Sequence, residues 1–380
     1  EILCRLPVSV KNSTPESRLK TPLHKSDGND KLLQVLREEQ DMTAHYKHMN
    51  PFLQTADADN MMHIAEQFGS FGTYADEASN DGLGEKLPQR FDAAANYIAK
   101  GIDGEGNADD KQTAGHRTNY FRETYAYGEE VQAPGIEPFM QHPELVKTAQ
   151  AISGRDVIVP AIVYANLLIP GQELAVHTDV PEFRGANRKV LPQWLLVTML
   201  HSGLFDAWRI PIATCVSWFG KAEGGAFTFY PEGATGPREA IPAAHNSAIL
   251  IDTDEVFHGV ERVSEKQPDL PPIEKSARLH YLGDNKWQLR DGDAVLADDY
   301  DWSEIRYSIS WKAYCFADAA EKALWQEGAD DLTVDFVLDR LEEALCKDGV
   351  LTGSRPEPTA FARMMVSHFI RFPQQQIAAE

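Results

Sequence analysis

Cysteine is scarce in this chain. Four of its 380 residues are cysteines, they are widely spread, and no two of them form a CxxC pair. This spacing argues against a disulfide scaffold and against a zinc ribbon, because both need closely paired cysteines. A chain with so few thiols suits a reducing compartment, and we expect a cytoplasmic protein.

Long apolar runs are also lacking. No run reaches the roughly 18–20 apolar residues that a membrane helix needs. The longest one, residues 157–170, is interrupted by Pro160, Tyr164 and Asn166. The first residues do not contain the uninterrupted apolar segment of a signal peptide. We therefore expect no contact with a membrane.

Positive charge is in short supply. Lysine and arginine number 36 against 58 aspartates and glutamates, which gives a formal net charge of −22. Nucleic acids and anionic membranes need a basic surface, so this balance argues against both as partners. A small molecule or a peptide is the better expectation for a substrate.

The first part of the chain, residues 1–155, indicates helices and irregular segments that pack on a core. Residues 31–49 and 90–102 place apolar side chains at helical spacing. Residues 142–154 also predict a short helix, and Gly154 stands where a C-terminal cap would be.

From residue 156 to residue 316 the pattern changes to short β-branched and aromatic runs separated by turn-forming stretches. Many short strands at close spacing predict a sandwich or barrel, and eight runs match the strand count of a jelly roll. One of these predicted strands is WLLVTML, residues 194–200. Residues 317–380 indicate helices again, which pack on the barrel or on a second subunit in a homo-oligomer. The predicted class is α+β, with a β core wrapped by helices from both ends.

One short motif points to metal chemistry. His177-Thr178-Asp179 lies at the end of a predicted strand, where residues i and i+2 share a face, so His177 and Asp179 can reach one metal. His258, in VFHGVERV, supplies a third ligand from another strand. Two imidazoles and one carboxylate on one face of an octahedron leave three positions open, as non-haem Fe(II) oxygenases require. A lone H-x-D triplet is expected by chance, so the order of the strands carries the prediction.

That order resembles a known superfamily. HTD ends an early strand, GGAFTFYP opens a middle strand with two glycines, SAILIDTDEVFHGVERV carries the distal histidine, and RYSIS lies on the last strand. Over residues 160–316 this resembles the 2-oxoglutarate/Fe(II)-dependent oxygenases. The resemblance implies a double-stranded β-helix (jelly-roll or cupin-like) core, catalytic and metal-binding residues His177, Asp179 and His258, and the cofactors Fe(II), 2-oxoglutarate and O₂.

The resemblance also suggests a cosubstrate anchor. In these enzymes an Arg or Lys on the last strand binds the distal carboxylate of 2-oxoglutarate, and Arg306 with Ser308 matches the common Arg-x-Ser. Arg306 follows His258 by 48 residues, whereas compact members have about ten, so residues 264–303 are predicted to be an inserted loop and hairpin. That insertion is a candidate substrate lid. Arg262, four residues after His258, is the alternative anchor.

Other polar residues have two interpretations each. Tyr164 and Asn166 share a face of the first core strand, where they bind the other carboxylate of the keto acid or satisfy buried polar neighbours. A basic cluster follows just after the metal motif and consists of Arg184, Arg188 and Lys189. One interpretation is that this cluster holds an anionic group of the substrate, and the other is that it belongs to a solvated loop.

We therefore predict a dioxygenase that hydroxylates an unactivated C–H bond of a metabolite or amino-acid-like substrate and forms succinate and CO₂. A peptidyl or protein hydroxylase of the same superfamily is an alternative. A metal-binding, cupin-like protein without redox chemistry is the alternative from another class.

Overall fold

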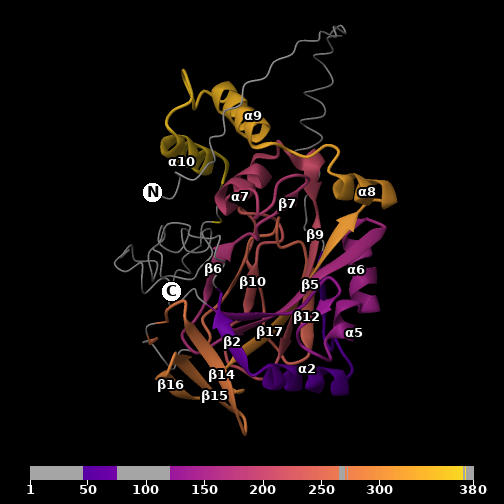
Figure 1. Cartoon of the computed structure of the whole chain (residues 1–380), viewed down its shortest axis with the longest axis vertical. Helices are drawn as coiled ribbons and strands as arrows, with labels where there is room; N and C mark the ends of the chain where they lie inside the picture. Colours follow the sequence, from indigo (N-terminus) through magenta and orange to yellow (C-terminus); the bar gives the residue numbers. More distant parts are fainter. Residues whose placement is uncertain (1–45, 75–119, 265–269, 272, 371–372, 374–380) are drawn as a thin grey trace.

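The computed structural model describes residues 46–74, 120–264, 270–271, 273–370 and 373. Within them, most strands join one eleven-stranded sheet in which every pairing is antiparallel (Figure 1). Its strands, in spatial order, are β1 (Lys47–Met49), β12 (Ser247–Ile251), β9 (Ile212–Phe219), β17 (Arg306–Phe316), β5 (Val157–Leu168), β3 (Phe121–Tyr127), β2 (Ser70–Thr73), β14 (Ala277–Gly283), β15 (Lys286–Asp291) and β16 (Ala294–Asp301), with β4 (Glu130–Val131) beside β3.

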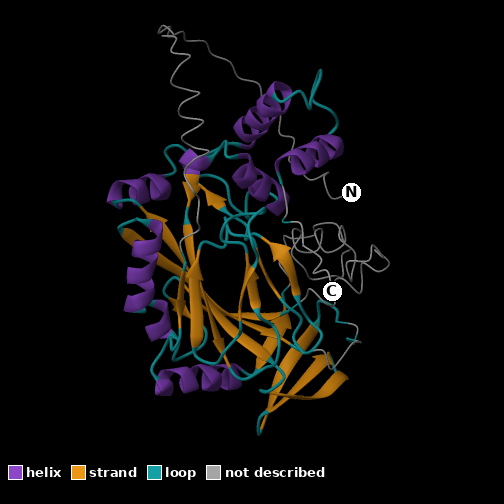
Figure 2. Ribbon diagram, turned by 180° about the vertical axis from the view of Figure 1, so that it is seen from behind, coloured by secondary structure: helices purple, strands orange, loops and turns teal. Residues whose placement is uncertain are grey.

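A smaller, four-stranded sheet faces the large one (Figures 1 and 2). Aromatic and aliphatic side chains from both sheets, among them Trp218, Ile249 and Phe229, form one buried cluster. The order of the small sheet is β11 (Glu239–Ile241), β10 (Phe227–Phe229), β13 (His258–Val260) and β6 (Leu174–His177); a separate pair consists of β7 (Glu182–Phe183) and β8 (Arg209–Ile210).

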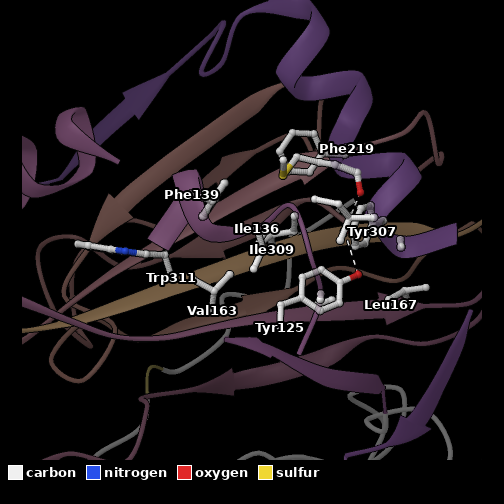
Figure 3. Close-up of a cluster of buried hydrophobic side chains, with 14 of the residues drawn as sticks. Tyr125, Ile136, Phe139, Val163, Leu167, Phe219, Tyr307, Ile309 and Trp311 are labelled. Atoms are coloured by element: carbon white, nitrogen blue, oxygen red, sulfur yellow. Dashed lines mark hydrogen bonds between the residues drawn. The ribbon is translucent and has the colours of Figure 1, made fainter. Parts of the chain in front are cut away.

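Strand β17 separates an apolar face from a polar one. Successive side chains of a strand point to opposite faces. Ile309 and Trp311 belong to the largest apolar cluster, together with Val163 and Leu167 of the neighbouring β5 (Figure 3). The residues that alternate with them on β17 are polar: Arg306, Ser308, Ser310 and Lys312. The sequence of this one strand therefore directs four polar side chains toward the space between the two sheets.

Helices cover the apolar face of the large sheet. They are α2 (Thr55–Phe68), α5 (Glu137–Met140) and α6 (Pro143–Ser153). Trp311 donates its indole N–H to the carbonyl of Met140 at 2.9 Å, and the Tyr307 hydroxyl donates to the carbonyl of Met61 at 3.1 Å. The predicted helix at residues 142–154 is confirmed, and Gly154 ends it in the left-handed conformation with φ 63°.

The strand predicted at residues 194–200 is wrong, because this segment belongs to α7 (Gln193–Ser202). All residues from Gln193 to Met199 are buried, so the sequence shows no alternation that would distinguish a strand from a helix. The helix packs into a second apolar cluster with α9 (Val334–Lys347) and α10 (Pro358–Phe369). The helices expected after residue 317 are confirmed as α8 (Ala319–Glu327), α9 and α10.

The chain before residue 156 adds strands as well as helices. Helices and irregular segments were expected there, yet β1, β2 and β3 all belong to the large sheet. Strand β3 pairs with β5 on one side and β2 on the other, so neighbouring strands decide its conformation. The helical pattern at residues 90–102, and the greater part of that at 31–49, lie outside the described residues.

The hairpin predicted within residues 264–303 is confirmed. Strands β14 and β15 turn at Asp284 and Asn285, which both have positive φ (49° and 62°), as tight hairpins favour. Strand β14 also pairs with β2, so the insertion extends the large sheet. Among the described residues, no helix is long and apolar enough to cross a membrane.

Candidate metal centre

His177 and His258 lie directly opposite each other on β6 and β13. Both are buried, and their ring centroids are 4.4 Å apart. Asp179 follows two residues after His177, and its Oδ1 lies 3.9 Å from Nε2 of each histidine. The three residues therefore come together as their H-x-D…H spacing predicts. Each offers one ligand atom, and these atoms lie within 4.8 Å of one another, close enough to hold a metal ion.

Backbone hydrogen bonds orient both imidazoles. Nδ1 of His177 lies 2.6 Å from the carbonyl oxygen of Ala175, and Nδ1 of His258 lies 2.9 Å from that of Val256. A carbonyl can only accept, so each Nδ1 must carry the proton. In the neutral form of such an imidazole, Nε2 is the nitrogen that can bind a metal, and each Nε2 lies 3.9 Å from Oδ1 of Asp179.

Asp179 is held through its other oxygen. Oδ2 accepts a hydrogen bond from the Thr253 hydroxyl and one from the Lys312 ammonium, both at 2.6 Å. Since Thr253 gives its only hydroxyl proton to Asp179, Thr214 must be the donor in the 2.8 Å contact between the two threonines. Burial disfavours the Lys312 charge, but Asp179 and Asp254 raise the pKa of Lys312 above its usual value. Lys312 and the threonines thus fix the carboxylate so that Oδ1 faces the two imidazoles.

This donor set fits a divalent metal such as Fe(II). It offers two neutral imidazoles and one carboxylate oxygen, which is the set that non-haem iron sites use. Neighbouring ligands of an octahedral ion with bonds of about 2.1 Å are about 3 Å apart, so small side-chain movements would close the present 3.9 Å separations around an ion.

The triad opens into one pocket between the two sheets. Its wall includes all four polar residues predicted to bind the cosubstrate, and among the described residues none of the 264–303 insertion contributes to it. This gives the lid hypothesis no support. The lining residues are Tyr120, Tyr164, Asn166, Leu168, Leu174, His177, Asp179, Thr214, Val216, Phe227, Thr253, His258, Val260, Arg306, Ser308 and Ser310.

Arg306 is the most unusual residue of this wall. Its side chain is 3 % exposed, and burial lowers the pKa of the guanidinium from 12.5 to about 9. Nε donates to the carbonyl of Gly225 at 2.6 Å, and Nη1 lies 3.4 Å from the Ser308 hydroxyl. Nη2 is buried without a partner, and no carboxylate of the described residues pairs with this arginine.

The double glycine of the middle strand explains how Arg306 fits. Gly225 has φ +63°, and a Cβ there would lie 2.5 Å from Cδ of Arg306. Gly224 has φ +73°, and its Cβ would lie 2.6 Å from the backbone oxygen of Arg262. Both positions therefore require glycine, for backbone conformation and for space.

The remaining predicted residues divide between the pocket and the surface. The Oδ1 atom of Asn166 is buried without a partner, and its Nδ2 lies 3.4 Å from the Ser310 hydroxyl. Arg262 pairs instead with Glu173 at 3.3 Å, and more than a third of its side chain is exposed. Arg262 therefore faces away from the cavity in which the triad and Arg306 meet.

The basic cluster after the metal motif is split. Arg184 makes a two-bonded ion pair with Asp330, at 2.8 Å each, and also donates to a backbone carbonyl. Lys189 is exposed, whereas Arg188 donates to the Tyr74 hydroxyl at 3.0 Å. Neither Lys312 nor Arg122 belongs to a motif that would have selected it; the position of Lys312 in the inward row of β17 was the available signal.

No protein-family model and no curated protein matches the chain. Among solved structures it is similar to a prolyl-4-hydroxylase from Pseudomonas putida, at 10% identity over 72% of this chain and 94% of that one, with a TM-score of 0.36. It is also similar to a 2OG-Fe(II) oxygenase family oxidoreductase from Burkholderia pseudomallei (9% identity, 79% and 96% covered, TM-score 0.37). A third is HygX from Streptomyces hygroscopicus, solved with nickel, 2-oxoglutarate and hygromycin B (8% identity, 75% and 86% covered, TM-score 0.36).

Proposed function

We propose that this protein is an Fe(II)/2-oxoglutarate-dependent oxygenase with a jelly-roll core, and that it hydroxylates a C–H bond of a small molecule. His177, Asp179 and His258 would hold the iron. Arg306 and Ser308 would bind the distal carboxylate of 2-oxoglutarate, in place of the alternative anchor Arg262.

The single observation that carries this proposal is the buried guanidinium of Arg306. A charge removed from water is costly unless a counter-charge and hydrogen bonds replace the lost hydration. Arg306 has one bonded carbonyl, one long contact and one unpartnered nitrogen. A carboxylate in the pocket would supply the missing acceptors and a compensating charge, bound through two parallel hydrogen bonds.

A keto dicarboxylic acid satisfies both ends of the pocket. The triad leaves coordination positions for a chelating keto acid, and Arg306 lines the same cavity. Zinc hydrolases and simple metal-binding proteins need no second carboxylate site. The pairing of the triad with an uncompensated arginine therefore favours the oxygenase over the cupin-like alternative.

The chain's own residues have distinct tasks in this proposal. Iron and 2-oxoglutarate together supply, when bound, the oxidation of a C–H bond coupled to decarboxylation of the keto acid. Lys312 and Thr253 fix the orientation of Asp179. Leu168, Val216 and Phe227 give the pocket an apolar wall that limits water around the site.

The test is binding and turnover of 2-oxoglutarate. Purified protein with Fe(II), ascorbate and O₂ should convert 2-oxoglutarate to succinate, slowly without substrate and faster with the right metabolite. His177→Ala should abolish succinate formation, Arg306→Met should weaken 2-oxoglutarate binding by about 100-fold (roughly 2.7 kcal/mol), and Arg262→Met should change neither. Tight zinc binding without any 2-oxoglutarate binding would refute the proposal in favour of the non-redox alternative.

A further inference from the structure

A second arginine, Arg122, lies on the inner face of the large sheet next to the pocket. On β3 its Cα pairs with that of Asn166 on β5, and directly opposed residues of neighbouring strands share a face. Asn166 is in turn opposite Ser308 on β17. Adjacent strands are about 4.8 Å apart, so Arg122 and Ser308 are separated by about 10 Å at the backbone. Arg122 and Arg306 therefore lie on opposite sides of β5; Arg306 lines the pocket, and Arg122 contacts the lining residue Tyr164.

Aromatic rings position Arg122 without neutralising it. The guanidinium carbon lies 3.6 Å from the centroid of the Tyr164 ring and 4.9 Å from that of Tyr74. Tyr74 stacks on Tyr120, with centroids 5.2 Å apart and planes within 8°. Cation–π contacts orient a guanidinium and leave its N–H groups available to an anion. Tyr120 and Tyr164 both line the pocket, so this group of rings forms part of its wall.

Arg122 differs from other half-buried or buried arginines of the described chain. Arg184 pairs with Asp330, Arg209 with Asp252, and Arg278 with Glu123. No ion pair within the described residues includes Arg122. A protein with 22 more acidic than basic side chains thus leaves this position without a carboxylate.

A second cation stands nearby. Arg188 donates to the hydroxyl of Tyr74, the same ring that lies under Arg122, and its charge acts on Arg122. Both guanidinium groups thus lie at the same tyrosine, where an anion could reach the two of them. Planar guanidinium groups bind carboxylates and phosphates through paired hydrogen bonds.

We infer that Arg122, assisted by Arg188, binds an anionic group of the substrate, a carboxylate, at the tyrosine-lined wall of the pocket. The inference rests on the proposed function, because it assigns Arg306 to the cosubstrate and Arg122 to the molecule that is oxidised. The substrate class is then a small carboxylic acid whose reacting carbon lies between the tyrosine wall and the metal. Arg122 contributes specificity, and the metal site stays intact without it.

The experiment uses the nickel-loaded protein saturated with 2-oxoglutarate, so that the position at Arg306 is occupied. Acetate is the carboxylate probe and inorganic phosphate the second probe, and binding is followed through the arginine Nε–Hε resonances. Acetate should bind in the millimolar range and shift the Arg122 resonance. Arg122→Gln should weaken acetate binding at least tenfold, and Arg122→Lys should weaken it less. Arg278→Gln, on strand β14 beyond β2, should leave it unchanged.

The outcomes separate the two proposals. The inference is overturned if the wild type does not bind acetate, or if Arg122→Gln binds it as well as the wild type does. If phosphate binds more strongly than acetate, the choice of a carboxylate is overturned. A loss of 2-oxoglutarate binding in Arg122→Gln would place Arg122 in the cosubstrate site and also overturn it. If the wild type does not bind 2-oxoglutarate, the proposed function fails. The anion site would still be supported if acetate binding is lost in Arg122→Gln and kept in Arg306→Met.

Discussion

Lys312 and Thr253 determine how Asp179 faces the two histidines of the candidate metal centre, although neither belongs to the H-x-D…H motif. Both donate to Oδ2 at 2.6 Å, which leaves Oδ1 facing the histidines. Partners of this kind restrict a ligand to one orientation, and their loss commonly costs 10–100-fold in metal affinity. The chemistry of the triad therefore depends on side chains from β17 and from the segment after β12.

Replacing Lys312 with Met should weaken metal binding. The variant loses the charge that fixes Asp179 and leaves two buried carboxylates, Asp179 and Asp254, without their shared cation. We expect nickel affinity to fall about 10–100-fold by calorimetry. Lys312→Arg, which keeps the charge, should lose less, and Lys347→Met on the exposed side of α9 is the control. Equal nickel affinity in Lys312→Met and the wild type would contradict this role.

Arg306 should destabilise the protein when no ligand is present. Its buried guanidinium has no acidic partner in the described chain, so an apolar side chain of similar length removes an uncompensated charge. We expect Arg306→Met to raise the free energy of unfolding of the metal-free protein by about 1–4 kcal/mol, measured by urea denaturation. Arg262→Met removes a partly exposed pair and should change it by less than about 1 kcal/mol. A destabilised Arg306→Met protein would show that the charge is compensated.

Asp254 predicts a dependence of stability on pH. Burial raises its pKa from 3.8 to about 7, and neither carboxylate oxygen has a hydrogen-bond partner. Because the folded pKa lies above the unfolded one, the folded protein takes up a proton between pH 7 and pH 4 and the wild type gains stability as pH falls through that range. Asp254→Asn should therefore be more stable than the wild type by about 2–4 kcal/mol above pH 7, with the difference vanishing near pH 4.

Urea denaturation at a series of pH values measures this difference. Asp293→Asn, in the exposed turn between β15 and β16, is the matched control and should show a small, constant difference. An Asp254→Asn advantage that stays the same from pH 4 to pH 8 would mean that this carboxyl does not titrate with folding.

Among the elements, β17 shows what the sequence could predict and what it could not. Alternation and the Arg-x-Ser match placed Arg306 and Ser308 on one face, and the structure puts both in the pocket. Lys312 lies in the same row, but lysines are usually solvated, so its contact with Asp179 could not be predicted without the tertiary fold. Arg122 was missed for a similar reason: β3 has no motif, and its position follows from pairing with β5.

The secondary-structure prediction from the sequence was wrong for a segment that is buried on all sides. Residues 194–200 are apolar except for Thr198, and all but the last are buried. Neither a helical period of 3.6 nor a strand period of 2 is visible in them, so a strand was predicted where α7 lies. Helices with one exposed face, such as α9, were predicted correctly because their apolar residues recur at helical spacing. The meeting of His177, Asp179 and His258 was predictable because the order of the strands, together with the H-x-D motif, brings the three residues to one place.

The turn that opens β10 should control the cosubstrate anchor. A Cβ on Gly225 would lie 2.5 Å from Cδ of Arg306, so Gly225→Ala must displace that side chain. We expect the dissociation constant for 2-oxoglutarate to rise at least tenfold, with nickel affinity unchanged, in calorimetric titrations. Gly233→Ala is the matched control: it has a similar positive φ of +81°, but nothing within 4 Å of the added carbon.

Both glycine variants introduce a left-handed residue and should each cost about 1–2 kcal/mol of stability. The effect on 2-oxoglutarate binding separates them, because only Gly225 contacts Arg306. Equal weakening by both variants would show that backbone strain, and not the displaced arginine, is responsible.

At the scale of the whole molecule, net charge opposes folding. Even if each of the 36 lysines and arginines paired with one acidic residue, 58 − 36 = 22 carboxylates would remain without a partner. Repulsion among them acts over the Debye length, which falls from about 30 Å at 0.01 M salt to about 3 Å at 1 M. Sodium chloride should therefore raise the thermal midpoint of the metal-free protein by a few degrees, because screening weakens the repulsion of the compact state.

Differential scanning calorimetry across that salt range measures this effect. A variant with four exposed acids that form no ion pair within the described residues, Glu129, Glu130, Asp298 and Glu327, replaced by their amides should start from a higher midpoint and respond less to salt. A midpoint that falls as salt is added would mean that attractive ion pairs, such as those of Arg184 and Arg209, outweigh the repulsion. The rise should persist in Arg306→Met, because it depends on the total charge and not on the pocket.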